Sequence, residues 1–278
     1  MNARRKLFFF GKGGAPAPVG LLNTTEGAGA AFAISLRMLN ADLIGQDAIE
    51  VKRVANSDFD RFSLTADGVP LSDIASFCGA SDGIVSWMLD QSGNGFHATQ
   101  TAEASTAFIY RDGAITSKNG KAVLDFRGGQ FYNVITENIT TGQFFTVFEA
   151  RQVGLRRRLY DSESGGRWTR RLTGQDDSFG GIFAGQFLSF PVDVNTFLQE
   201  THTYNTSSSA AFQNGVSVAS GDPGSNSLGT LLRIGTREGA TADFFDGVLG
   251  ELILFPTIKG SGDQETVEQN QIDYYAVS

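Results

Sequence analysis

The chain has 278 residues, of which 41% are hydrophobic and 11% are aromatic, with 34 glycines and 23 phenylalanines. This composition allows one large core and favours a β-sandwich or barrel, and no apolar run approaches the roughly 18 residues of a membrane span. The formal net charge of −8 argues against nucleic acid as the main partner, because phosphate binding needs a positive face.

Residues 1–27 are predicted to form an extended arm, because a basic start is followed by three phenylalanines and then by GKGGAPAPVG. Its apolar run is shorter than the ~7–15 residues of a signal peptide. Two interpretations stay open, a frayed terminus and an anchor that inserts into a partner. The candidate anchoring residues are Arg4, Arg5, Lys6, Phe8, Phe9 and Phe10.

The elements that follow are mostly short strands. Residues 28–39 can form either a helix or a strand, and residues 71–78 predict a helix capped by Ser72 and ended by Gly79. Predicted strands cover residues 84–89, 122–126, 144–150, 181–185, 187–190, 230–236 and 244–255.

Two local patterns near the C-terminus are more specific. Asn214-Gly215 between alternating residues predicts a hairpin over 209–219. Val267, Ile272 and Tyr275 lie at roughly helical spacing and predict a short terminal helix. Residues 28–278 are therefore expected to form one all-β domain, an antiparallel jelly-roll β-sandwich that ends in a helix.

Two segments resemble known families. The C-terminal third, AAFQNGVSVA through LRIGTREGATADFFDGVLGELILFPT, resembles the concanavalin A-like, laminin-G-like jelly roll. The motif positions are Phe245, Gly247, Gly250, Glu251, Ile253 and Phe255. Residues 28–105, with SLRML, VKRVANSD and DQSGNGFHATQ, resemble the α-L-arabinofuranosidase B family, and such segments also occur with jelly-roll ends in tailed-bacteriophage structural proteins.

The arabinofuranosidase resemblance implies a catalytic pair and a disulfide, and this sequence departs from both. The family's acid position corresponds to Arg237, and the GRWTRRLTGQDDSFGGIF region has no clear equivalent of the nucleophile. Cys78, the chain's one cysteine, would pair with position 83, which is glycine. No catalytic residue is predicted, although Asp176 and Asp177 stay open as carboxylates in another geometry.

The stretch DQSGNGFHATQ at 90–100 has two interpretations. Asn and Gly tolerate positive φ and Asp can cap a turn, which favours a structural turn. The alternative is a loop that touches sugar or a neighbouring subunit. Trp87 lies in an apolar run and is expected in the core, whereas Trp168 lies next to the arginines and is the better candidate for an exposed tryptophan. The candidate glycan-binding residues are therefore Trp168, Asp90, Asn94 and His97.

The stretch 151–172 is rich in arginine and predicts a hairpin, with strands in LRRRLY and RWTRRL. One interpretation is an exposed face whose charges discourage edge pairing. The other is an interface to an acidic partner, for example a second copy that presents Asp263, Glu265 and Glu268. The candidate interface residues are Arg156, Arg157, Arg158, Arg167, Arg170 and Arg171.

The leading hypothesis from the sequence is a non-enzymatic structural protein of a phage particle, a head fibre, decoration or tail-associated protein located on the virion. It would contact other virion proteins through its arm and form a homo-oligomer, without cofactor or metal. The alternative is a carbohydrate-binding module for host-surface glycan, and a further alternative is an arabinofuranosidase-like hydrolase.

Overall fold

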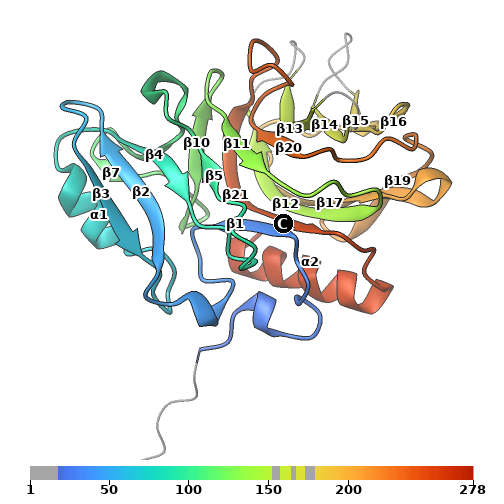
Figure 1. Ribbon diagram of the computed structural model, residues 1–278, viewed down its shortest axis with the longest axis horizontal. Coiled ribbons are helices and arrows are strands. Elements are labelled where there is room, and N and C mark those ends of the chain that lie inside the picture. The colour runs from blue at the N-terminus through green and yellow to red at the C-terminus, as the bar shows by residue number, and fades with distance from the viewer. Residues whose placement is uncertain (1–17, 152–156, 164–166, 173–178, 278) are drawn as a thin grey trace, which may run out of the picture.

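A computed structural model describes residues 18–151, 157–163, 167–172 and 179–277 (Figure 1). The predicted antiparallel β-sandwich with a C-terminal helix is confirmed, because paired antiparallel strands and two α-helices make up the described regular structure. Several predicted residues lie outside the described residues. These are the anchoring residues of the arm, the interface candidate Arg156, and the candidate carboxylates Asp176 and Asp177.

One layer runs across the upper part of the molecule and contains ten strands (Figure 1). Consecutive neighbours in this layer pair antiparallel. In spatial order the strands are β3 (Phe59–Ser63), β2 (Asp47–Arg53), β4 (Gly83–Met88), β5 (Ala98–Thr99), β11 (Tyr132–Ile135), β20 (Leu231–Ile234), β13 (Arg158–Ser162), β14 (Thr169–Arg171), β15 (Phe179–Phe183) and β16 (Phe187–Pro191).

The second layer is centred on the last strand of the chain. This strand pairs with one long strand on one side and with two short strands on the other. The members of the layer are β1 (Phe32–Ser35), β10 (Leu124–Arg127), β21 (Asp246–Phe255), β12 (Gly142–Ala150), β17 (Leu198–Tyr204), β18 (Ser209–Gln213) and β19 (Val216–Gly221). The strand β6 (Phe108–Arg111) joins the two layers, because it pairs with both β4 and β10.

Short elements complete the fold. They are β7 (Ala114–Ile115), β8 (Ser117–Lys118), β9 (Lys121–Ala122), four 3-10 turns (Leu21–Asn23, Ala41–Leu43, Glu103–Ser105, Thr206–Ser208), α1 (Leu71–Cys78) and α2 (Ser261–Tyr275). Among the described residues, no helix combines the length and apolar character that crossing a membrane would need.

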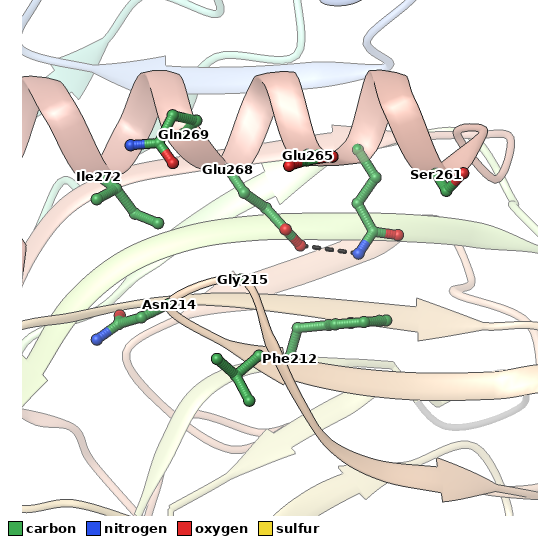
Figure 2. A pocket seen from close by; sticks show the side chains of 10 residues that line it. Phe212, Asn214, Gly215, Ser261, Glu265, Glu268, Gln269 and Ile272 are labelled. Atoms are coloured by element: carbon green, nitrogen blue, oxygen red, sulfur yellow. Dashed lines mark hydrogen bonds between the residues drawn. The ribbon is translucent and has the colours of Figure 1, made fainter.

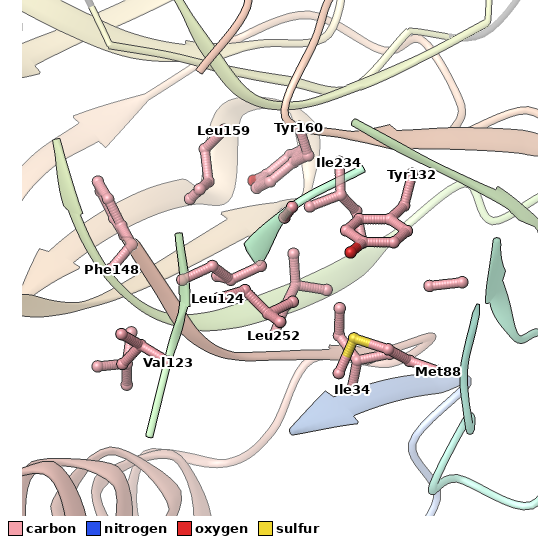
Figure 3. Close-up of a cluster of buried hydrophobic side chains, with 14 of the residues drawn as sticks. Ile34, Met88, Val123, Leu124, Tyr132, Phe148, Leu159, Tyr160, Ile234 and Leu252 are labelled. Atoms are coloured by element: carbon pink, nitrogen blue, oxygen red, sulfur yellow. The ribbon is translucent and has the colours of Figure 1, made fainter. Parts of the chain in front are cut away.

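The core lies between the two layers. Tyr132, Tyr160 and Ile234 point down from the upper layer onto Leu252 and Leu124 of the lower one, and all five are almost fully buried (Figure 3). Strand β12 is buried at every position, because the upper layer covers one of its faces and α2 lies along the other. This is consistent with the sequence of residues 144–150, FFTVFEA, in which five of seven side chains are apolar.

The local predictions hold where the turn chemistry is strong. Asn214 and Gly215 both have positive φ, at 49° and 77°, as a two-residue hairpin requires. Residues 28–39 contain a strand, β1, and not a helix. The predicted cap of α1 is wrong, because Pro70 occupies the N-cap position and Ser72 lies inside the helix.

Part of the predicted arm packs on the sandwich. Leu21 is buried in a cluster with Phe145 and Phe255, and the N–H of Leu22 donates to the carbonyl oxygen of Leu39 at 2.8 Å. The division between arm and domain at residue 27 therefore does not coincide with the start of packed structure.

Candidate functional site

The DQSGNG stretch is a structural turn. The Asp90 carboxylate accepts hydrogen bonds from the backbone N–H groups of Ala33, Ser92 and Phe96 at 2.9–3.0 Å. The Asn94 amide donates to the carbonyl oxygen of Ala31 at 3.0 Å. These bonds tie the turn to the start of β1, so Asp90 and Asn94, two predicted glycan-binding residues, have structural partners instead.

The turn ends beside an open aromatic pocket. The rings of Trp87 and His97 lie 4.7 Å apart, and with Phe96, Thr99 and Ile135 they line a cavity of about 370 Å³. Ile135 is 73% exposed, which is unusual for so large an apolar side chain. Of the predicted glycan-binding residues, His97 alone lies at this pocket.

The imidazole of His97 is held neutral at this pocket. Burial lowers the pKa of His97, and the charge of Asp90 opposes this shift without reversing it. Its Nδ1 accepts the N–H of Asp90 at 3.1 Å, which fixes the ring orientation. The pocket therefore presents an uncharged ring pair at neutral pH.

The burial of the two tryptophans is the reverse of the prediction. Trp168 is fully buried and stacks on Tyr204 with ring centroids 4.4 Å apart, so it cannot be a surface platform. Trp87 is half-buried on the outer face of its strand, beneath the guanidinium of Arg61 at 5.4 Å. The prediction of Trp168 as the exposed tryptophan is wrong.

A second pocket gathers three of the predicted interface arginines. Arg158, Arg167 and Arg171 line a cavity of about 220 Å³ with Phe183 and Phe187. Arg171 lies 5.4 Å from the ring of Phe187, which is 38% exposed. The predicted hairpin is confirmed here, because β13 pairs antiparallel with β14.

A buried carboxylate fixes the arginines of this pocket. Asp161 is fully buried and accepts two hydrogen bonds from Arg167, at 3.1 and 3.0 Å. Arg158 lies 3.4 Å from the same carboxylate and 3.2 Å from Asp243. The pocket therefore holds preoriented guanidinium groups, which suit planar anions.

Arg170 is not part of this surface. It is fully buried between the layers, where its Nε and Nη2 donate to Glu200 at 2.6 and 2.7 Å, and His202 binds the same carboxylate at 2.7 Å. Burial would raise the pKa of Glu200, but the charge of Arg170 and the hydrogen bonds outweigh burial and lower it. Burial lowers the pKa of His202. The prediction of Arg170 as an interface residue is wrong.

A third cavity, of about 500 Å³, lies between the β18–β19 turn and helix α2 (Figure 2). Glu268 points into this space from α2 and accepts a hydrogen bond from Gln264 at 2.8 Å. Burial raises the pKa of Glu268 against the opposing effect of its hydrogen bonds. Glu265 and Glu268, predicted as partners for a neighbouring copy's arginines, thus line a cavity of their own chain.

The remaining chemistry-bearing groups are few. Within the described ranges, no cluster of three His, Cys, Asp or Glu side chains could hold a metal ion. Burial raises the pKa of Cys78 to about 11, so the thiol is unreactive at neutral pH. A Cβ placed on Gly83 would collide with Cys78 Sγ, so these two positions face each other as the arabinofuranosidase resemblance implies.

No protein-family model and no curated protein matches the sequence. Solved structures do match. An arabinofuranosidase complexed with arabinofuranosyl-α-1,2-xylobiose has a TM-score of 0.66 at 13% identity, and a GH54 α-L-arabinofuranosidase soaked with a cyclic sulfate inhibitor has 0.65 at 14%. Each match covers 87% of this chain and 62% of the other, so the chain spans less than two thirds of their length.

These comparisons correct the leading functional hypothesis. The similar structures are arabinofuranosidases, which contradicts the predictions of a virion structural protein and of a chain without enzymatic function. The resemblance to phage proteins has no counterpart among these structures, whereas the resemblance to arabinofuranosidases is matched at the level of the fold. At this identity the likeness establishes the β-sandwich fold alone.

Proposed function

We propose that this protein recognises carbohydrate on the outer face of the upper layer, at the pocket formed by Trp87, Phe96, His97, Thr99 and Ile135. The observation that carries the proposal is the Trp87–His97 ring pair, tilted by 51° at a centroid distance of 4.7 Å, in an open pocket. Both rings are half-buried and contribute aromatic surface to the pocket at the protein's exterior, where a ligand can contact it.

The surroundings of the pocket suit a sugar ring. A sugar presents an apolar face of C–H groups and a rim of hydroxyls, so it needs an aromatic surface beside polar groups. Thr99 supplies a hydroxyl at the edge of the pocket. Next to Trp87 across the sheet, Glu50 is bound by Arg61 at 3.2 Å, so a charged pair borders the ring.

The test is a glycan array followed by calorimetry with the glycans that bind. Trp87→Ala should weaken binding by about tenfold or more, which corresponds to about 1.4 kcal/mol of lost stacking and apolar burial. Phe59→Ala is the matched control, because Phe59 is 60% exposed on the same layer but does not line the pocket. Equal binding by the Trp87 and Phe59 variants would overturn the assignment to this pocket.

Glycoside hydrolysis at the arginine pocket is a second candidate function. The fold of the similar enzymes supports it, and so does the position of Glu238, whose N–H donates to Asp161 at 2.9 Å and whose charge acts on Arg167. Retaining glycosidases use two carboxylates about 5–5.5 Å apart. Asp161 is fully buried and accepts two hydrogen bonds from Arg167, so the half-buried Glu238 is the described carboxylate that would act as acid.

This candidate is tested with 4-nitrophenyl α-L-arabinofuranoside. If the protein hydrolyses it, Glu238→Gln should lower kcat by about a hundredfold or more. Asp176→Asn and Asp177→Asn examine the two carboxylates predicted from the sequence. Turnover that survives all three substitutions would exclude these residues, and a rate no higher than that of buffer would contradict hydrolysis of this substrate.

A further inference from the structure

The aromatic pocket and the arginine pocket lie on one continuous face of the upper layer. Trp87 on β4 pairs with Thr99 on β5, and Thr99 pairs with Asn133 on β11. Asn133 pairs with Arg233 on β20, and Arg233 pairs with Asp161 on β13. Residues directly opposite each other in a ladder project to the same face, so this row extends unbroken from one pocket to the floor of the other.

The row continues beneath the arginines. Asp161 pairs with Thr169, and Thr169 pairs with Phe183, which lines the arginine pocket. Arg158 reaches back over this row, because its Nη1 donates to Thr169 Oγ1 at 3.3 Å. The face therefore carries an aromatic pocket at β4–β5 and a cationic pocket at β13–β15.

The separation of the pockets sets the size of a ligand that would use both. Six strand-to-strand steps lie between Trp87 and Phe183, and at about 4.8 Å a step this gives roughly 29 Å along the sheet. One sugar ring cannot reach across such a distance, whereas an oligosaccharide of several rings can. The side chains of Asn133 and Arg233, between the pockets, are polar and can bind its hydroxyls.

The charge at the far end selects the class of sugar. Among the described side chains around the second pocket there are four arginines, Arg158, Arg167, Arg171 and Arg233, and three carboxylates, Asp161, Asp243 and Glu238. Within the described part of the chain, the buried Nε of Arg233 has no hydrogen-bond partner. An anionic substituent on the sugar chain would accept hydrogen bonds from the guanidinium groups of Arg167 and Arg171, which line the pocket.

We infer that the ligand is an extended acidic oligosaccharide that lies across the strands from β4 to β15, with a neutral ring on Trp87 and a carboxylate-bearing ring at Arg167 and Arg171. The inference rests on the proposed carbohydrate function and adds length, direction and charge to it. It assigns one continuous binding track where each pocket alone would accommodate one ring.

The experiment is calorimetry on the full chain with xylo-oligosaccharides of increasing length, each with and without a glucuronic acid branch. Affinity should rise with length and level off once the chain spans both pockets. The branched long chain should bind about tenfold or more tightly than its neutral counterpart, as a charge-assisted pair would give. Arg171→Ala should remove that difference and leave the short neutral chain unaffected.

The controls separate this inference from the proposal on which it rests. Arg127→Ala removes an equal charge from β10, away from both pockets, and should leave all affinities unchanged. If short chains bind through Trp87 but affinity depends neither on length nor on the acidic branch, the track is wrong and the aromatic pocket stands. If no saccharide of the series binds, and the glycan array is equally negative, both proposals fall.

Discussion

Arg170 and Arg171 are neighbours on β14, and their side chains lie on opposite faces of the upper layer. Arg170 points between the layers and is fully buried, and it donates a hydrogen bond to Glu200. Its guanidinium carbon lies 4.4 Å from the centre of the Phe190 ring. Arg171 points outward beside Phe187, at a pocket open to solvent. Because side chains alternate along a strand, the same residue type supplies an internal ion pair at one position and a candidate ligand contact at the next.

The largest expected contrast comes from substituting each arginine with methionine. Arg170→Met leaves the Glu200 carboxylate buried without its cation and should lower the free energy of unfolding by about 3–5 kcal/mol. Arg171→Met changes a half-buried side chain on the outer face of β14 and should cost less than about 1 kcal/mol. Urea unfolding of both variants measures this, and similar losses would contradict the opposite placement of the two side chains.

Phe190 and Phe187, the aromatic partners of Arg170 and Arg171, should show the same difference in stability loss on substitution, but a smaller one. Phe190 is 1% exposed and Phe187 is 38% exposed. Phe190→Ala opens a cavity in the core and should cost about 3 kcal/mol, whereas Phe187→Ala should cost less than about 1 kcal/mol. Thermal unfolding of the two variants side by side is the measurement, and a larger loss for Phe187→Ala would reverse the assignment of faces.

Substitution of Arg167 is expected to lower the free energy of unfolding by an amount between those for Arg170 and Arg171. Its side chain is 28% exposed, yet it makes two hydrogen bonds to the fully buried Asp161. Arg167→Ala should cost about 2 kcal/mol, because Asp161 keeps Arg158 as a partner. Arg167→Lys restores the charge without the paired hydrogen bonds and should recover part of the loss. Complete recovery would mean that charge alone matters at this position.

The smallest expected effect is the pH dependence of the buried cluster. The folded-state pKa of His202 lies below its unfolded value of about 6.5, so the unfolded chain binds the extra proton first as the pH falls. Stability should therefore decline by about 1.4 kcal/mol per pH unit below about pH 6.5, until the folded pKa is reached.

His202→Gln should remove this part of the slope, while His97, whose pKa is also lowered, contributes equally to both proteins. Unfolding at pH 6.5 and pH 5.5 measures the difference. The lowered pKa of Glu200 acts in a separate window, below its unfolded value of 4.5, where its stabilisation is lost as the pH falls. Identical slopes for His202→Gln and the parent chain would contradict a neutral buried imidazole.

The sequence predicts well what is decided locally. Positive φ at Asn214 and Gly215 follows from the residue types, and the sequence of residues 144–150 predicts a strand, which is β12. The residue types of DQSGNG likewise favour a structural turn, and backbone N–H groups converge on the Asp90 carboxylate there. Cap chemistry is less decisive, since Pro70 begins the helix in place of Ser72.

The candidate site was not predictable in the same way. Trp87 lies in the apolar run IVSWML, yet its cross-strand neighbours Glu50 and Thr99 place it on the open face. Trp168 has arginine neighbours in sequence, but Tyr204 and Phe144, which are distant in sequence, enclose it. The face of a strand depends on register with remote strands, which a local pattern does not contain.

The pairing of β21 has a consequence for how the chain acquires its structure. This strand, residues 246–255, lies between β12 and the two strands β1 and β10, so it fills the middle of its layer. As a ribosome synthesises the chain, β1 emerges more than two hundred residues before the partner it needs, since Phe32 pairs with Leu254. Folding of the lower layer must therefore wait for nearly the whole sequence, and such long-range closure is slow and leaves strand edges open to aggregation in the interval.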